Sequence, residues 1–459
     1  MEDLTKGPIS GHLFKTASFM LVTMVFQTLY FLVDLYWVGR LGKEAVAAVG
    51  VAGNLTFIVL AISQMLGVGT TTLVAHAAGQ RNKERALLVF NQSQLLSMLV
   101  GALFLVIAMT FRRAYAHGLS ADASTAELAA DYLLWFLPAM GLQFGLVAMS
   151  AALRGVGNFK PGMVVQTTTV IINIVLAPVL MFGWGTGRPM GVAGTALASL
   201  IAVAVGVGWL ATYFVGRESY LMFLWRDMKP QFKLWGDLLK IGLPAGAEFG
   251  LMAVYLMIVY VVARPFGAAA QAGFGIGMRI VQALFMPVVA LGFAVAPVAG
   301  QNFGARQGDR VKAVFKTASM MAGTAMFIAA IACNIAPQAL IRIFSTDPEV
   351  IAVGDEYLRI ISWNFVASGL VFVASSMFQA MGNTIPSLMA SFSRLAIIAI
   401  PVLLLSRLPG FELRWIWYLS VTAILIQLTI ILLLLRREFR LRLDTMPSAP
   451  LADSAPAAG

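Results

Sequence analysis

The sequence is poor in charged residues and almost lacks cysteine, and each shortage excludes a class of protein. Only 12% of its 459 residues are Asp, Glu, Lys or Arg, whereas 59% are hydrophobic. Soluble domains carry about 25% charged residues, so this composition indicates a membrane protein. The single cysteine, Cys333, excludes a disulfide within the chain.

Signatures of nucleotide hydrolysis, metal binding and nucleophilic catalysis are also missing. The sequence has no G-x-x-x-x-G-K-[ST] loop, no H-E-x-x-H motif and no G-x-S-x-G motif. An intramembrane enzyme would need a nucleophile or a metal set, so we expect no enzymatic activity, no metal and no cofactor. Without an ATP-binding module, any active transport would be driven by an ion gradient, with a proton or sodium as the coupling ion.

Long apolar runs fill most of the chain. A helix needs about 20 predominantly apolar residues to cross a bilayer, and we place about twelve such runs. They lack the alternating pattern of outer-membrane strands, so they predict helices. The runs are 16–39, 45–72, 87–110, 128–153, 161–183, 190–216, 238–263, 268–298, 314–336, 354–380, 385–407 and 414–435.

The net charge of +11 is explained by membrane topology rather than by nucleic-acid binding. Cytoplasmic loops carry an excess of Lys and Arg, and here the basic residues gather in alternate loops. The intervening loops also contain acids, as in FSTDPEVIAVGDEY. We therefore expect a multi-pass plasma-membrane protein, in a bacterium the inner membrane, with both termini cytoplasmic. The first residues, MEDLTKGPISGHLFK, do not have the pattern of a cleavable signal peptide.

The two halves of the sequence repeat each other at an offset of 225 residues. RGVGNFKP at 154–161 aligns with QAMGNTIP at 379–386, and VAHAAGQRNKER at 74–85 aligns with VAGQNFGARQGDR at 298–310. Each half contains six spans, and an even number makes the repeats parallel, related by an axis along the membrane normal. The repeat predicts two six-helix bundles that rock against each other to give alternating access.

The longest basic loop, 217–237, joins the two halves. We therefore predict an N-terminal lobe with its connecting loop at 1–228 and a C-terminal lobe at 229–442. The segment 443–459 is rich in Pro, Ala and Ser and lacks an apolar face, so we expect a disordered cytoplasmic tail.

Asp34 is a lone carboxylate inside the first apolar run. A charged side chain near the bilayer centre costs roughly 2.5–3.5 kcal/mol and marks a functional site. Low dielectric favours the neutral form of a carboxyl group. A proton arriving from outside would neutralise Asp34, and a bound organic cation would then lose its counter-charge and leave. Competition for one carboxylate is therefore a sufficient antiport mechanism.

Gln27, Tyr30, Phe31 and Trp37 share the helix face of Asp34, because they lie seven, four, three and three residues from it along the helix. An aromatic face can hold a flat organic cation, with a contribution of about 0.5–2 kcal/mol per ring. The alternative is that these aromatic side chains only pack against neighbouring helices.

Glu248 is a second acid within a span, and Met252 and Tyr255 follow on its face. It either lines the C-terminal half of a central cleft or pairs with a buried cation. Arg279 and Arg394 also fall within spans and need a partner, a wet cavity or an interface. Arg279 with Glu248 is one possible ion pair.

The strings LVAHAAGQ, APVAGQNFGAR, FLVDLYWVGRLG and RGVGNFKP resemble those of the MATE (multidrug and toxic compound extrusion) exporters, NorM-like and DinF-like members included. The resemblance covers residues 12 to about 436. It implies two six-helix bundles in a V shape and efflux of organic cations, drugs among them, in exchange for protons or sodium. We expect a monomer. The superfamily also contains polysaccharide and lipid-linked oligosaccharide flippases, which would need a cleft rich in basic groups.

The resemblance also implies roles for single residues. Asp34 matches the family's first-helix carboxylate, and Asn173 matches the asparagine of the fifth-helix motif N-x-x-x-D. The acid of that motif is Ala177 here, which weakens a sodium cage and favours a proton. Ser199 falls near the family's sixth-helix hydroxyl. The predicted coupling residues are thus Asp34, Glu248 and Asn173, and the predicted substrate contacts are Gln27, Tyr30, Phe31, Trp37, Ser199, Met252 and Tyr255.

Overall fold

A computed structural model describes residues 2–120, 122–185, 187–216 and 220–446. Twelve of its helices are long and apolar enough to cross a membrane, and the described residues contain no strand. The predicted all-α membrane fold is therefore confirmed. Most helices run past the predicted apolar runs, because a helix can continue beyond the hydrocarbon core into the loops.

The N-terminal lobe consists of six helices that pack around two clusters of buried apolar side chains. Asn82 and Asp122 cap two of these helices, since their side chains accept hydrogen bonds from the backbone N–H of Arg85 and Thr125. The helices are α1 (Ile9–Gly39), α2 (Lys43–Gly79), α3 (Lys83–Leu119), α4 (Ala123–Gly155), α5 (Phe159–Phe182) and α6 (Val192–Val215).

The C-terminal lobe surrounds one large apolar cluster. One of its candidate spans is built from α11, a short 3₁₀ turn and α12 in series. The helices are α7 (Phe232–Ala263), α8 (Ala268–Gly304), α9 (Gly308–Ile335), α10 (Pro337–Arg342), α11 (Pro348–Ile361), α12 (Phe365–Ala380), α13 (Ile385–Leu405) and α14 (Arg414–Arg442), and the 3₁₀ turns are η1 (Trp225–Asp227), η2 (Arg264–Phe266) and η3 (Ser362–Asn364).

The sequence repeat recurs in the backbone. Arg81 and Arg306 are separated by the offset of 225 residues, and they are the two non-glycine residues with positive φ in the described part of the chain, at 56° and 58°. Gly157 and Gly382, separated by the same offset, have φ values of 78° and 73°. A left-handed residue typically ends a helix, so both lobes end equivalent helices in the same way.

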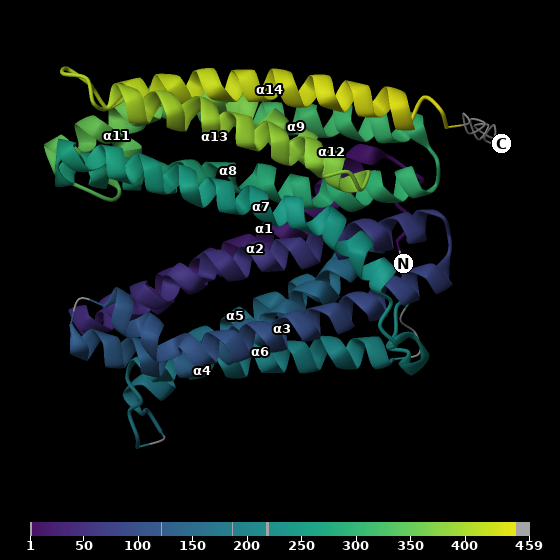
Figure 1. Ribbon diagram of the computed structural model, residues 1–459, viewed down its shortest axis with the longest axis horizontal. Helices are drawn as coiled ribbons and strands as arrows, with labels where there is room; N and C mark the ends of the chain where they lie inside the picture. Colours follow the sequence, from purple (N-terminus) through teal and green to yellow (C-terminus); the bar gives the residue numbers. More distant parts are fainter. Residues whose placement is uncertain (1, 121, 186, 217–219, 447–459) are drawn as a thin grey trace, which may run out of the picture.

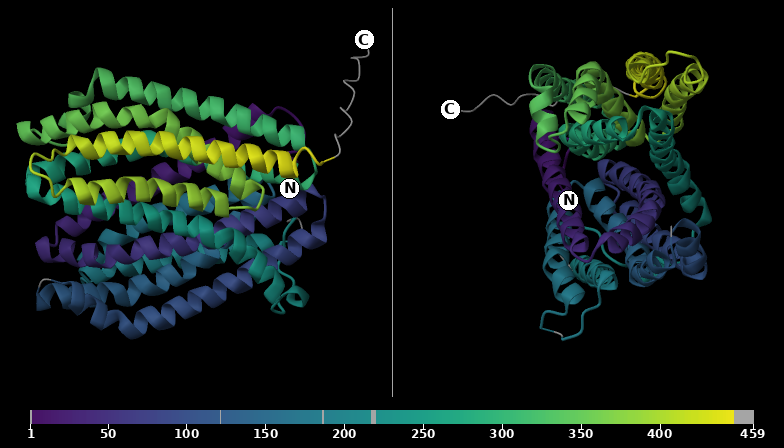
Figure 2. Two further views of the ribbon diagram at one scale, coloured as in Figure 1. Left: turned by 45° about the horizontal axis from the view of Figure 1, so that its top comes forward. Right: turned by 90° about the vertical axis from the view of Figure 1, so that its left-hand side faces the viewer.

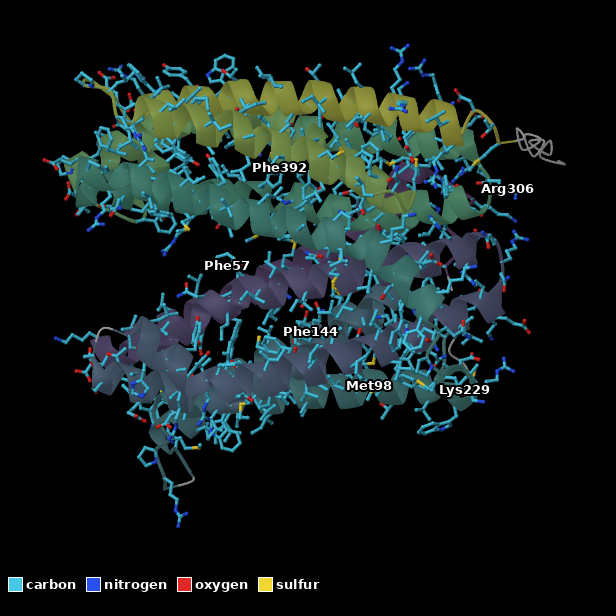
Figure 3. All side chains as sticks on the ribbon, in the orientation of Figure 1. Phe57, Met98, Phe144, Lys229, Arg306 and Phe392 are labelled. Carbon is cyan, nitrogen blue, oxygen red and sulfur yellow. The ribbon has the colours of Figure 1, made fainter. Side chains whose placement is uncertain are left out.

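The two lobes form two stacks of helices that meet at one end and diverge at the other (Figure 1). α2 packs against α7 and α8, and α1 packs against both α5 and α8; Figure 2 shows the same arrangement from two further sides. The start of α1 and the end of α14 lie at the end where the stacks meet, which we name the closed end. The basic side chains of Lys229 and Arg306 also lie there (Figure 3).

Two glycines let the helix backbones of the lobes touch at the closed end. A Cβ atom added to Gly79 of α2 would lie 2.0 Å from the carbonyl oxygen of Gln301 in α8. One added to Gly304 would lie 2.3 Å from the carbonyl oxygen of His76. Any side chain would therefore push α2 and α8 apart, as in other membrane helix pairs that rely on small residues.

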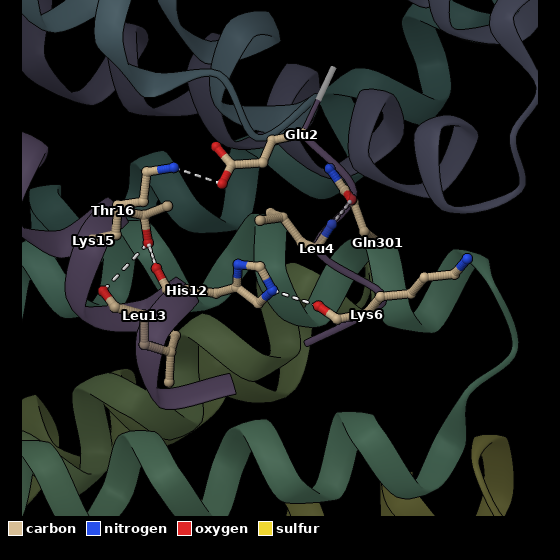
Figure 4. A network of polar contacts seen from close by, with 8 residues as sticks. All are labelled: Glu2, Leu4, Lys6, His12, Leu13, Lys15, Thr16 and Gln301. Carbon is tan, nitrogen blue, oxygen red and sulfur yellow. Dashed lines mark hydrogen bonds and ion pairs between the residues drawn. The ribbon is translucent and has the colours of Figure 1, made fainter. Parts of the chain in front are cut away.

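Residues 2–8 precede α1 and form a segment that contacts both lobes, which we name the N-terminal strap. Leu4 is fully buried, and its backbone N–H donates to Gln301 Oε1 over 3.0 Å (Figure 4). The Gln301 side chain in turn donates from Nε2 to the carbonyl oxygen of Gly155 in α4, at 2.9 Å. The backbone N–H of Glu2 donates to the carbonyl oxygen of Val156, also at 2.9 Å. The strap thus ties the end of α4 to the end of α8.

The predicted lobe boundary after residue 228 falls between η1 and α7 and stays a prediction. The predicted tail, 443–459, lies outside the described residues from 447 onward.

Candidate functional site

Asp34 lies on α1 in the N-terminal lobe. Its Oδ1 atom is buried and has no hydrogen-bond partner among the described residues. Tyr30 and Tyr132, from α1 and α4, interact electrostatically with its carboxylate. A buried polar oxygen without a partner is costly and calls for an explanation such as a bound proton or ion. Asp34 therefore has the surroundings of an ion site.

A chain of hydroxyl and amide groups continues from this carboxylate to α5 and α6. The Tyr30 hydroxyl lies 3.2 Å from Ser199 Oγ. Asn173 Nδ2 donates to the same oxygen over 2.8 Å, and Ser199 Oγ donates to the carbonyl oxygen of Thr195 at 3.1 Å. The structure thus brings together four of the residues predicted from sequence, Asp34, Tyr30, Asn173 and Ser199. Their functional roles stay predictions.

Ala177 occupies the place of the motif's acid and is buried. It follows Asn173 by one helical turn of α5 and supplies no oxygen from its side chain. Besides Asp34, the residues of this cluster contribute only neutral oxygens, from Tyr30, Asn173 and Ser199. The cluster therefore holds a single carboxylate.

The other aromatic residues of the first helix have mixed surroundings. Phe31 is 61% exposed and its ring centre lies 5.3 Å from that of Tyr30. Trp37 packs edge-on against Phe182 and Trp184, with ring centres 5.9 and 5.8 Å apart. This contact matches the packing alternative for Trp37. Gln27 is exposed on α1.

Glu248 lies on α7 and faces α13. Ser387 donates a hydrogen bond from Oγ to Glu248 Oε1, and a second short hydrogen bond joins Ser387 to Ser375 of α12. The possible ion pair between Glu248 and Arg279 is wrong: Arg279 is exposed on α8, and no ion pair involves it in the described part of the chain. α7 packs mainly on α2 and α13, so Glu248 faces away from α8.

The same two helices carry a second polar pair farther along. Arg394 of α13 lies over the Tyr255 ring of α7, with Cζ 5.8 Å from the ring centre. Ser387 precedes Arg394 by seven residues, as Glu248 precedes Tyr255, so both pairs fall on one face of each helix. Tyr255 is also the 225-residue repeat of Tyr30. Met252, between them on α7, is 46% exposed.

Three residues of these clusters were missed by sequence reasoning: Tyr132, Ser375 and Ser387. Ser387 carries a signal, because Ser387, Ser391 and Arg394 form a polar stripe along a helix that is apolar elsewhere except at Ser393. Tyr132 has no such signal, since tyrosine near a span end is common.

The MatE family model matches residues 20–179 and 244–405. The chain is 24% identical over 442 residues to "Multidrug export protein MepA" of Staphylococcus aureus, with 96% of each protein covered. It is 24% identical over 371 residues to the "FAD transporter" of Shewanella oneidensis, covering 81% of this chain and 82% of that protein. A solved outward-facing structure of a multidrug resistance MATE family transporter superposes with a TM-score of 0.88 at 24% identity, covering 96% of this chain and 98% of the other.

Proposed function

Since the chain belongs to the MatE family of membrane transporters, we propose that it exports organic cations by exchanging them for protons through alternating access between its two lobes. Multidrug export is supported by the curated relatives. The observation that carries the finer proposal is the buried, unpartnered Oδ1 of Asp34.

Ionised Asp34 attracts an organic cation, and the neighbouring rings of Tyr30 and Phe31 favour flat cationic ligands. A proton that enters from the open end neutralises the carboxylate, and the cation leaves to the outside. Sodium coupling would call for several hard oxygen ligands around the ion, whereas the cluster offers one carboxylate and a few neutral oxygens. A proton needs only the carboxylate.

The closed end fits the cytoplasmic side in this proposal, because it carries the start of α1, the end of α14 and basic side chains such as Lys229 and Arg306. The structure then corresponds to a state that is open outward. The inward-open state would require the contact of α2 with α8 and the hydrogen bonds of the N-terminal strap to break.

Everted vesicles that contain the protein test the coupling ion. We expect uptake of a cationic dye into these inside-out vesicles, which corresponds to efflux from a cell, to persist when sodium is omitted and to stop when a protonophore dissipates the pH gradient. Vesicles from cells that lack the protein give the background. Dye efflux driven by a sodium gradient alone, at uniform pH, would remove proton coupling from the proposal.

Glu248 is proposed as a second coupling acid in the C-terminal lobe. Glu248→Gln keeps the shape and can still accept the hydrogen bond from Ser387, but it cannot bind and release a proton. We expect proton-driven efflux to fall about three- to tenfold, the equivalent of 0.5–1.5 kcal/mol. Glu84→Gln, at an exposed position of α3, is the matched control in the same vesicle assay. Unchanged efflux in Glu248→Gln would make this acid a structural hydrogen-bond acceptor only.

A second candidate is transport of an anionic molecule, as in the flippases of the same superfamily. Arg394 over the Tyr255 ring favours it, because its guanidinium group is a cation within a membrane-spanning helix and takes part in no ion pair among the described residues. Arg394→Gln would then reduce transport of an anionic flavin nucleotide and spare that of cationic dyes.

A further inference from the structure

A cavity of about 370 Å³ lies between α2, α3 and α4, apart from the polar clusters described above. Its size falls within the range of small-molecule sites, about 300–1,000 Å³. Eleven of its thirteen lining residues are apolar, and they include Ile58 and Ile62 of α2, Leu103, Ile107 and Phe111 of α3, and Leu137 of α4. We name it the α2–α3 groove.

The α2–α3 groove faces the hydrocarbon of the bilayer. Leu103 and Ile107 are 59% and 51% exposed although they lie within a membrane-spanning helix. The lining stripe on α3 runs from Val100 to Phe111, which is about 16 Å at 1.5 Å per residue. The hydrocarbon core is about 30 Å thick, so the stripe covers about one leaflet, in the half of the molecule away from the closed end.

Two polar side chains lie at one end of the groove, and one of them is unsatisfied. The Tyr115 hydroxyl donates to the carbonyl oxygen of Val51 over 2.9 Å. Arg112 has a buried Nη1 atom without a hydrogen-bond partner among the described residues, and none of the ion pairs in the described chain involves it. A guanidinium group at the end of an apolar span matches a phosphate in charge and geometry.

We propose that the α2–α3 groove binds an acyl chain of a phospholipid from the leaflet at the open end, with the lipid phosphate paired to Arg112. The groove runs along one leaflet. It ends at the Arg112 guanidinium group, where the apolar part of α3 gives way to polar residues. An organic cation is a poor occupant, because the groove contains no acid and Arg112 repels it. The lipid occupies the N-terminal lobe independently of whether Asp34 exchanges protons for drugs.

Photocrosslinking of the full chain tests the site. The protein is reconstituted into vesicles of phosphatidylethanolamine and phosphatidylglycerol with a phospholipid that carries a diazirine on its acyl chain. After illumination, mass spectrometry locates the adducts. We expect them to concentrate on residues 100–111 of α3 and to exceed those on exposed apolar residues of α14, such as Leu425 and Leu433.

Two substitutions act on different parts of the groove. Arg112→Gln removes the partner of the phosphate, and we expect groove adducts to fall about tenfold, as for the loss of a charged hydrogen bond. Leu103→Trp fills the groove and lowers the same adducts. Arg113→Gln, at the exposed neighbouring position, is the control and leaves labelling unchanged. Gel filtration checks that each variant is folded. If Leu103→Trp does not fold, Arg112→Gln alone tests the site.

Equal labelling of the groove and of α14 would overturn the proposal, since it would indicate ordinary annular lipid. Groove adducts that persist at the same level in Arg112→Gln would show that Arg112 does not hold the lipid phosphate. Displacement of the label by micromolar transported dye would assign the groove to substrate instead of lipid.

Discussion

Asp34→Asn is expected to lower drug efflux by at least about tenfold and to leave a folded protein in the membrane. Asparagine has nearly the same shape as aspartate, so the packing of α1 is kept. It cannot exchange a proton or attract a cation. The lost charged contact corresponds to about 1.5–3 kcal/mol, or roughly ten- to hundredfold in transport.

Dye uptake into everted vesicles, which corresponds to efflux from a cell, measures this effect, and immunoblotting of the membrane fraction checks expression. Asp131→Asn is the matched control, because Asp131 is an exposed acid on α4. Its efflux should equal that of the unmodified protein. Proton-dependent efflux that survives in Asp34→Asn would end the assignment of this residue as the exchange site.

Gly79→Val is expected to force the closed end apart. The new side chain meets the backbone of Gln301, which cannot rotate away, and overpacking of this kind costs about 1–3 kcal/mol. The balance between closed and open forms of this end would shift by about five- to hundredfold. Transport would fall because the outward-open state is depleted.

Spin labels at Lys83→Cys and Asp309→Cys, exposed at the starts of α3 and α9, report this separation. We expect a longer distance in Gly79→Val. Gly53→Val is the control on the same helix, since an added Cβ there meets nothing within 4 Å. An unchanged distance together with normal efflux in Gly79→Val would show that the tight contact is not required for closure.

The fold could be predicted largely from two features of the sequence. Apolar runs of bilayer length allow only helices or closed barrels, and the constant offset of 225 residues predicts two equivalent lobes. The offset also aligns Arg81 with Arg306, and the structure gives both the same unusual backbone conformation. A backbone conformation of this kind depends on the local sequence, so a repeat in the sequence predicts the same conformation in both lobes.

The lateral order of the helices could not be predicted in the same way. A helix inside a bundle is apolar on most sides, so hydropathy does not say which neighbour faces Glu248. Ser387 rather than Arg279 is its partner because α7 packs on α13. The spacing places Trp37 on the same helix face as Asp34, yet Trp37 packs on Phe182 and Trp184. This contact depends on where α5 ends relative to α1, which the spacing within α1 cannot predict.

The N-terminal strap has a consequence for how the molecule is made. Leu4 is among the first residues to leave the ribosome, and Gln301, to which it binds, is made 297 residues later. At about 5–20 residues per second, the wait is roughly 15–60 seconds. During that time the first lobe can insert and fold and Glu2 can reach Val156, but Leu4 has no Gln301 to bind. The strap can complete its contacts only after most of the second lobe's α8 has been synthesised, so the start of the chain reaches its final contacts later than the rest of the first lobe.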